Sequence, residues 1–155
     1  MEFTFGSIKL KIIDNHISIP GTDELKDFKI SCQCWPISGY HAGCYKWVMA
    51  NIQKIRDNID ETKAVYISGH SLGGSIAQVL GCLLQDAGMD VELSIQGAFP
   101  AVIYQQLKGI AEVYGNDPIP GLFPWFRFPV QIVYTGSDRK WWKINFSDHV
   151  GYWND

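Results

Sequence analysis

A serine inside a glycine-rich turn, between an apolar run and an amphipathic stretch, constrains the fold of this chain most. Residues 64–68, AVYIS, form a short β-branched run that is typical of a buried parallel strand. Residues 75–88 carry apolar side chains at helical spacing, and Gly88 suits a C-cap. Residues 69–73, GHSLG, join the two and match the pattern G-x-S-x-G. This order predicts a sharp elbow with a strained backbone that lifts the Ser71 hydroxyl above a sheet.

The rest of the chain alternates predicted strands and helices, which indicates an α/β sheet with mostly parallel strands. Apolar and polar residues alternate on both sides of Asp14, which predicts two strands joined by a turn. Helical spacing predicts helices over 41–60 and 101–109. Further strands are expected at 91–99, 110–115, 130–136 and 140–145. Ligands of such sheets bind beyond the C-terminal ends of the strands.

A nucleophilic serine needs a base that is itself held by a carboxylate. In sheets with such an elbow, the chain order is serine, acid, histidine. His149 is the only histidine after Ser71 and is therefore the predicted base. Asp117 is the favoured acid, because it follows the predicted strand 110–115 and Pro118 biases it toward an extended backbone. The other carboxylates after the serine include Asp86, Asp90, Glu92, Glu112, Asp138 and Asp148.

Composition argues against several other classes of protein. The net charge is −3 without a basic run, so we expect no nucleic-acid partner. No stretch approaches the roughly 18 consecutive apolar residues of a transmembrane helix. The start, MEFTFGSIKL, lacks the features of a signal peptide, so the default expectation is a cytoplasmic protein. The four cysteines show neither CxxC nor metal-type spacing, so we expect free thiols and no metal. The 155 residues suit a single domain, 1–155.

Five segments together resemble the class 3 lipases, a family of fungal triacylglycerol lipases with an α/β-hydrolase fold. They are ISIPGTDELKDF, YHAGCY, VYISGHSLGGSIAQ, VYGNDPIPGLFP and SDHVGYW, and they occur in the family's order. The resemblance implies a minimal α/β-hydrolase-like fold, with a mostly parallel central sheet flanked by helices. It also implies that Ser71, Asp117 and His149 are a catalytic triad. The backbone N–H of Leu72, at the helix start, is an expected oxyanion donor, and the resemblance adds Thr22 as the second.

The chain departs from the family in two places near the predicted oxyanion hole. Pro20 stands where the family usually has an arginine, and the family's lid helix is replaced by the short segment 23–37. A short, partly charged segment has little apolar surface to exchange between closed and open states. We therefore predict hydrolysis of soluble esters without an interface. The alternative is that CQCWPI and LFPWFRF form an apolar lip that senses lipid.

Aromatic residues near the predicted acid are candidates for substrate contact. Trp125, Phe126 and Phe99 are expected to line an acyl pocket, and the alternative for each is core packing. The sequence thus predicts a serine carboxylester hydrolase, a lipase or esterase that acts on small-molecule or lipid esters through an acyl-enzyme without a cofactor. Contact with a lipid interface would be transient. Alternatives are a phospholipase A1 or acyltransferase with the same triad, or an inactive relative that binds lipid or a partner. The oligomeric state is not predicted.

Overall fold

The computed structural model of the protein describes residues 2–5, 8–21, 28–136 and 149. Its helices are α1 (Phe28–Cys32), α2 (Ala42–Arg56) and α3 (Leu72–Asp86), together with the 3₁₀ helix η2 (Ile119–Gly121). Its strands are β1 (Glu2–Phe5), β2 (Ile8–Ile13), β3 (His16–Ile19), β4 (Pro36–Ile37), β5 (Tyr40–His41), β6 (Val65–His70), β7 (Val91–Gln96), β8 (Lys108–Tyr114) and β9 (Gln131–Thr135).

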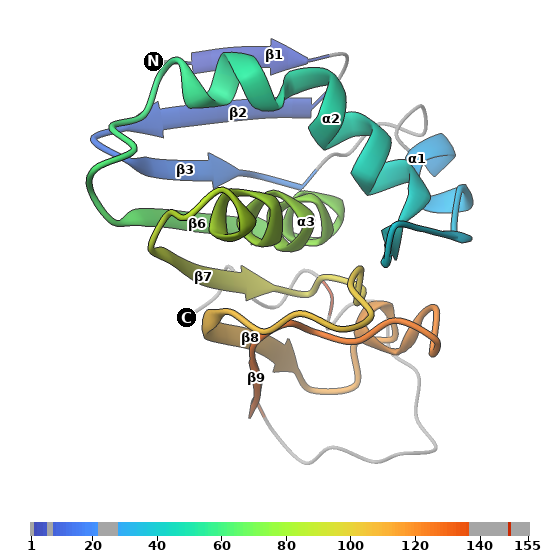
Figure 1. Ribbon diagram of the computed structural model, residues 1–155. Coiled ribbons are helices and arrows are strands. Elements are labelled where there is room, and N and C mark those ends of the chain that lie inside the picture. Colours follow the sequence, from blue (N-terminus) through green and yellow to red (C-terminus); the bar gives the residue numbers. More distant parts are fainter. Residues whose placement is uncertain (1, 6–7, 22–27, 137–148, 150–155) are drawn as a thin grey trace.

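A seven-stranded sheet forms the centre of the molecule, in the order β1-β2-β3-β6-β7-β8-β9 (Figure 1). The first three strands pair antiparallel, and every pair from β3 to β9 is parallel. Strands β4 and β5 form a separate two-stranded antiparallel sheet. The predicted mostly parallel central sheet is therefore confirmed, and so are its predicted strands within the described residues. The strand expected at 140–145 lies outside the described residues.

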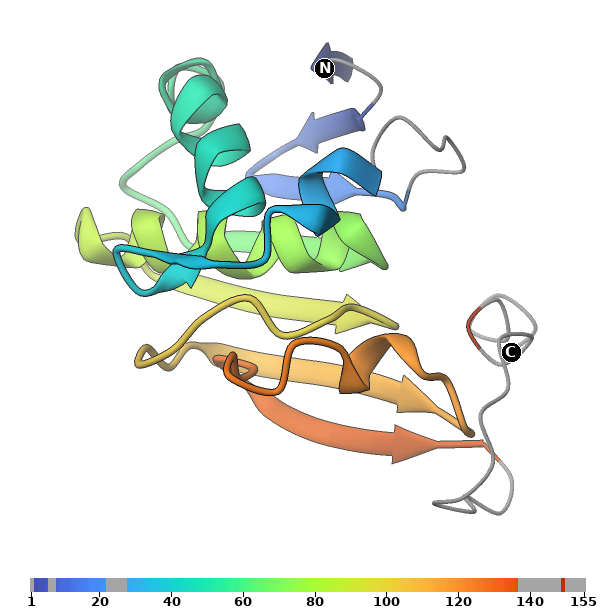
Figure 2. The ribbon, with the colours of Figure 1, turned by 90° about the vertical axis from the view of Figure 1, so that its right-hand side faces the viewer.

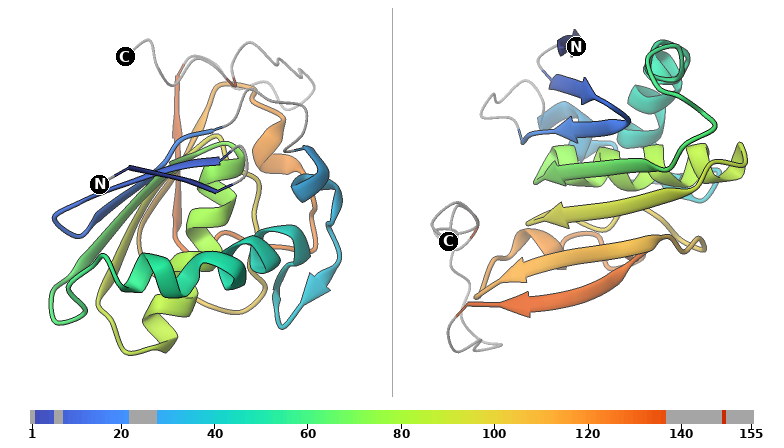
Figure 3. Two further views of the ribbon diagram at one scale, coloured as in Figure 1. Left: turned by 90° about the horizontal axis from the view of Figure 1, so that it is seen from above. Right: turned by 90° about the vertical axis from the view of Figure 1, so that its left-hand side faces the viewer.

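Helices α2 and α3 lie on the same face of the central sheet (Figures 1 and 3). Helix α3 runs along β6 and β7 (Figure 2). Burial alternates along β7 accordingly, with Val91, Leu93 and Ile95 buried and Glu92 and Ser94 exposed. Within the described ranges, no helix covers the second face. The buried core of the described residues therefore lies on the helix side of the sheet, and the opposite side carries polar side chains such as Glu92 and Ser94 together with the half-exposed Tyr66 and Ile110.

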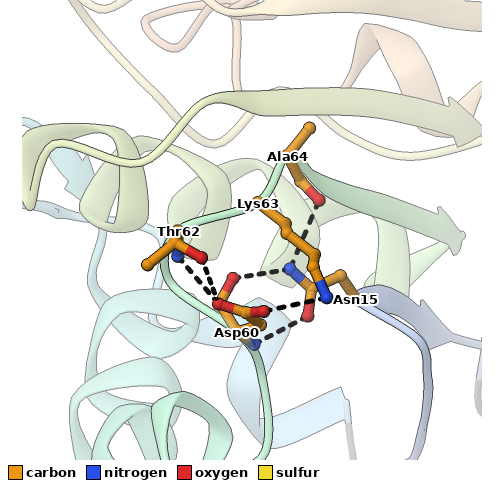
Figure 4. A network of polar contacts seen from close by, with 5 residues as sticks. All are labelled: Asn15, Asp60, Thr62, Lys63 and Ala64. Atoms are coloured by element: carbon orange, nitrogen blue, oxygen red, sulfur yellow. Dashed lines mark hydrogen bonds and ion pairs between the residues drawn. The ribbon is translucent and has the colours of Figure 1, made fainter.

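The Asn15 side chain anchors the turn between β2 and β3 to a loop that lies far away in the sequence. Asp14 and Asn15 both have positive φ angles, 46° and 64°, a conformation that Asn and Asp tolerate better than other L-residues. The Asn15 amide donates to the carbonyls of Asp60 (2.7 Å) and Ala64 (3.3 Å), and its oxygen accepts from the Asp60 N–H (2.7 Å; Figure 4). One side chain thus ties the hairpin to the loop that leads from α2 into β6.

The Asp60 carboxylate orders the same loop (Figure 4). It accepts hydrogen bonds from the Thr62 hydroxyl (2.6 Å) and backbone N–H (3.1 Å), and it pairs with Lys63 (3.0 Å). These donors, the Thr62 hydroxyl above all, lower the pKa of Asp60 to about 2. The loop therefore presents a fixed backbone to Asn15.

The segment between β7 and β8 is not a helix, so the prediction of a helix over 101–109 was wrong. Its backbone groups bond to distant partners instead of to one another. The Ala101 N–H donates to the Gln78 side chain (3.0 Å), the Ala101 carbonyl accepts from the His41 N–H (2.9 Å), and the Ile103 N–H donates to the Gly39 carbonyl (2.9 Å). Helical periodicity in the sequence reports only local bonding, and here tertiary hydrogen bonds replace it.

A buried histidine caps the start of α2. The His41 side chain is inaccessible to solvent; its Nδ1 accepts from the Cys44 N–H (3.4 Å), and its Nε2 donates to the Ser31 carbonyl (3.2 Å). This bonding pattern fits a neutral imidazole, because a proton on Nδ1 would remove the acceptor. Burial lowers the pKa of His41 to about 4. His41 is therefore part of the packing of the fold, in agreement with a structural role.

His41 makes the stability of the fold depend on pH. Between pH 6.5, its usual pKa, and about 4, its pKa in the folded state, the unfolded chain takes up a proton that the folded chain excludes. The contribution of neutral His41 to the free energy of unfolding is therefore complete above pH 6.5. It falls by up to about 3 kcal/mol as the pH drops through this window. We expect His41→Asn, which keeps a capping side chain but does not titrate, to lose this part of the pH dependence. Urea unfolding of both proteins at pH 7.5 and 4.5 measures it; equal losses would contradict the assignment.

Asn15→Ala is expected to destabilise the protein by about 2 kcal/mol, because the side chain makes three hydrogen bonds and Asn tolerates the positive φ. This corresponds to a decrease in melting temperature of about 6 °C for a chain of this size. Asn15→Gly is the matched variant. It loses the same hydrogen bonds as Asn15→Ala, but glycine adopts the positive φ without strain. Thermal unfolding should rank wild type above Gly and Gly above Ala. An alanine variant as stable as wild type would show that the hairpin does not depend on this side chain.

Candidate active site

Ser71 stands at the turn between β6 and α3 with the strained backbone that the motif predicts. Its φ and ψ are 53° and −127°, a region that non-glycine residues rarely adopt. The Ser71 N–H donates to the carbonyl of Gln96 at the end of β7 (3.0 Å), and its carbonyl accepts from the Ser75 N–H (3.1 Å). The sheet on one side and the helix on the other therefore fix the serine in a conformation that it would not keep alone.

Two glycines allow the strand and the helix to meet at this angle. A β-carbon at Gly73 would lie 2.2 Å from the carbonyl oxygen of Ile19 in β3. A β-carbon at Gly69 would lie 2.7 Å from the carbonyl oxygen of Gly73. Both distances are far below van der Waals contact with backbone atoms that cannot move aside. The glycines of G-x-S-x-G are thus required by the close approach of β3, β6 and α3.

The structure brings Ser71, His149 and Asp117 together in one line of hydrogen bonds. His149 Nε2 lies 2.9 Å from Ser71 Oγ, and His149 Nδ1 lies 2.9 Å from Asp117 Oδ2. The Asp117 side chain is fully buried and that of His149 is 18% exposed. Because an ionised carboxylate can only accept, His149 Nδ1 donates to Asp117 and Nε2 is left to accept from the serine hydroxyl. This arrangement can draw the proton from Ser71 as its oxygen attacks an electrophile.

Asp117 is held in place through both its carboxylate and its main chain. Its second oxygen, Oδ1, accepts from the Ile119 N–H (2.9 Å), and its own N–H donates to the Tyr114 carbonyl (3.1 Å). The carboxylate therefore cannot turn away from His149 without breaking its bond to Ile119, and the bond to Tyr114 fixes the main chain that carries it. Ser71 follows β6, and Asp117 follows β8, so both stand beyond the C-terminal ends of parallel strands. This is the edge at which α/β sheets bind ligands.

Of the two expected oxyanion donors, Leu72 and Thr22, the structure describes only Leu72. Leu72 is the first residue of α3, so its N–H belongs to the first turn, whose amides have no partner within a helix. Thr22 lies outside the described residues. The preceding residue, Gly21, is close to the elbow, since a β-carbon there would lie 3.3 Å from Ser71 Cβ.

The three aromatic residues predicted to contact substrate occupy two different environments. Phe99 and Phe126 are each 3% exposed and pack against the His41 ring, with centroids at 4.9 and 5.6 Å. Trp125 is 52% exposed, and its indole N–H donates to the Cys34 carbonyl (3.0 Å). Substrate contact stays a prediction for all three. The packing of the two phenylalanines also fits the alternative of core residues.

His70, inside the G-x-S-x-G motif, contacts the candidate base, and the sequence analysis had assigned it no role. Its Nε2 lies 3.3 Å from the His149 carbonyl oxygen, and the two rings are 5.0 Å apart. The order rule excludes His70 as the base because it precedes the serine. The signal that could have pointed to it is its place at the end of β6, next to Ser71 and on the opposite side of the strand from Gly69.

The described residues contain neither a cluster suited to a metal ion nor a helix suited to span a membrane. The described part of the chain holds no group of three or more His, Cys, Asp or Glu side chains suited to a metal ion. All four cysteines are free thiols. None of the helices in the described ranges is both long and apolar enough to cross a bilayer.

Comparison with known proteins agrees with the geometry of the fold. The mono- and diacylglycerol lipase of Aspergillus oryzae has a similar structure, with a TM-score of 0.64 at 15% identity over 96% of this chain and 66% of that one. The Lip2 lipase of Yarrowia lipolytica gives a TM-score of 0.56 at 16% identity over 86% of this chain and 64% of that one. At such identities the likeness establishes a shared α/β-hydrolase fold. The chain spans slightly less than two thirds of the length of either lipase.

Comparison with curated protein sequences gives no match. The family model described as "Lipase (class 3)" matches residues 17–125, which is more than half of the chain and includes Ser71 and Asp117. On this match and the motifs that it contains, the chain belongs to the class 3 lipase family.

Proposed function

We propose that this chain is a serine carboxylester hydrolase that cleaves lipid-type acyl esters through an acyl-enzyme. The observation that carries the proposal is the hydrogen-bonded line from Ser71 through His149 to Asp117, at the end of a strained elbow. Membership of the class 3 lipase family supports the same reaction.

In the first half of the reaction, Ser71 Oγ attacks the ester carbonyl carbon while His149 Nε2 accepts the hydroxyl proton. The carbonyl oxygen becomes an oxyanion, which the Leu72 N–H and Thr22 stabilise. Loss of one such donor typically raises the barrier by about 3 kcal/mol. The carbon–oxygen bond to the leaving group then breaks, His149 returns the proton to the departing alcohol, and the acyl group stays on Ser71.

In the second half, water replaces the alcohol. His149 accepts a proton from the water as its oxygen attacks the acyl-enzyme, and it returns that proton to Ser71 Oγ when the carboxylic acid leaves. Asp117 orients the imidazole and stabilises its positive charge in both halves. The reaction requires neither a metal nor an organic cofactor.

An exposed apolar surface around Trp35 and Trp125 supports a lipid ester as substrate. The Trp125 indole bonds to Cys34, so the segments CQCWPI and LFPWFRF are joined on the surface. Trp35 and Trp125 are each about half exposed, and Leu122 is 41% exposed. Exposed indoles are typical of surfaces that meet the polar–apolar boundary of lipids. This surface fits transient contact with a lipid interface.

Removing any member of the triad is expected to abolish most of the activity while the fold is retained. Ser71→Ala, Asp117→Asn and His149→Ala should each lower the kcat for p-nitrophenyl butyrate by about 10⁴-fold. Ser68→Ala is the matched control, because Ser68 lies three residues upstream on β6 and bonds to His16 rather than to the triad. A fluorophosphonate should label wild type and Ser68→Ala but not Ser71→Ala. Normal turnover in His149→Ala would exclude the proposed mechanism.

Hydrolysis of tributyrin is expected to follow simple saturation through its solubility limit. Helix α1, in the segment where the family carries its lid, is bonded to the start of α2 through the Ser31 carbonyl and the His41 imidazole. A helix of five residues held in this way has little apolar surface to release at an interface. Initial rates measured across the solubility limit decide the matter. A sharp rise at droplet formation would show that the apolar surface around Trp35 and Trp125 responds to lipid.

A further inference from the structure

His70 lies where three segments of the candidate active site meet. It is the last residue of β6 and directly precedes Ser71. In the sheet it pairs with Gln96 of β7, and its side chain lies on the face opposite the helices, because Val65 and Ile67 of the same strand are buried beneath them. The ring therefore extends beside the elbow and not into the core.

The His70 ring contacts the segments on both sides of the elbow. Its Nε2 is 3.3 Å from the His149 carbonyl oxygen, and the two imidazole rings are 5.0 Å apart at 31°. On the other side, a β-carbon at Gly21 would lie 2.8 Å from His70 Nδ1. The glycine before Thr22 thus leaves the space that the imidazole needs.

The His149 imidazole has to meet two partners that other segments of the chain carry. The sheet carries Ser71 and Asp117 directly, at the ends of β6 and β8, whereas His149 follows the end of β9 at Thr135 by 14 positions. Its imidazole must nevertheless keep one nitrogen 2.9 Å from each of two fixed partners. A misplacement of about 1 Å can lower the rate of an enzyme by roughly 100-fold.

We propose that His70 is a positioning residue for the base. The His70 Nε2–H donates to the main-chain carbonyl of His149 and holds that residue at the distance from which its side chain reaches both Ser71 and Asp117. The inference rests on the proposed function of these three residues. In this role His70 acts through the main chain of His149 and takes no part in the proton transfer itself.

Substitutions that keep or remove one atom test this role. In His70→Gln the amide nitrogen takes the place of Nε2 and can still donate, whereas in His70→Asn it takes the place of Nδ1 and cannot reach. His70→Leu retains the bulk without a donor. We expect the kcat for p-nitrophenyl butyrate to stay within about threefold of wild type in Gln and to fall about 10- to 100-fold in Asn and Leu, with KM within twofold. His16→Leu, on the same face of the sheet but at the start of β3, should leave the kcat unchanged.

A second measurement follows the hydrogen bond between His149 and Asp117 without relying on turnover. Its Nδ1 proton, bonded to a carboxylate, should give a strongly downfield proton resonance in wild type and His70→Gln and a weakened or absent one in Asn and Leu. Thermal unfolding identifies any variant that fails to fold, and the Asn and Leu variants substitute for each other in that case.

The two proposals fail in different ways. An active wild type whose Asn and Leu variants keep both the kcat and the resonance would overturn the role of His70 alone. A wild type that neither hydrolyses esters nor reacts with a fluorophosphonate would overturn the proposed function. The proton resonance of His149 would then still test the role of His70. Its loss in His70→Asn and His70→Leu but not in His70→Gln would support the positioning role. Equal resonances in all three variants would exclude that role.

Discussion

The strained backbone of Ser71 is the constraint on which the rest of the site depends. Its φ of 53° is kept because the Ser71 N–H bonds to β7, its carbonyl bonds into α3, and the neighbouring glycines let β3 and α3 come within contact. Relaxing this turn would move the hydroxyl away from His149 and would also separate the helix from the sheet. The position of the candidate nucleophile and the packing of the main core thus share one local geometry.

The parts of the fold that follow from local chemistry could be predicted from the sequence. The turn at Asp14, the helix that ends before Gly88 and the elbow at Ser71 each rest on residues a few positions apart. Gly88 indeed has a φ of 91°, and the Met89 N–H closes the helix on the Leu84 carbonyl. Asp117 and His149 were identified from chain order and strand position, and the structure brings both to Ser71. Their catalytic roles remain proposals.

Other features depend on contacts between distant residues, which periodicity does not report. Residues 101–109 have helical spacing, yet the backbone of Ala101 and Ile103 bonds to Gln78, His41 and Gly39, which lie far away in the sequence. Asn15 reaches a loop 45 positions later. His70 contacts a residue 79 positions later. The sequence alone does not reveal any of these contacts, because it shows neither the distant partners of the backbone nor whether the Asn15 and His70 side chains are exposed.

Within the described residues, helices pack on only one face of the central sheet (Figures 1 and 3), and this affects both the sequence pattern of the strands and their tolerance to mutation. Parallel strands are usually covered on both faces and are apolar throughout. Here β7 alternates, and on the face opposite the helices Gln96 and Thr135 both donate to Glu112, at 2.8 and 2.7 Å. Neighbouring positions of one strand therefore experience opposite selection: Leu93 and Ile95 accept only apolar residues of similar volume, whereas Glu92 and Ser94 are open to drift. Variation among related chains should thus alternate with a period of two residues along the strand. The face opposite the helices could then change its surface chemistry without disturbing the core.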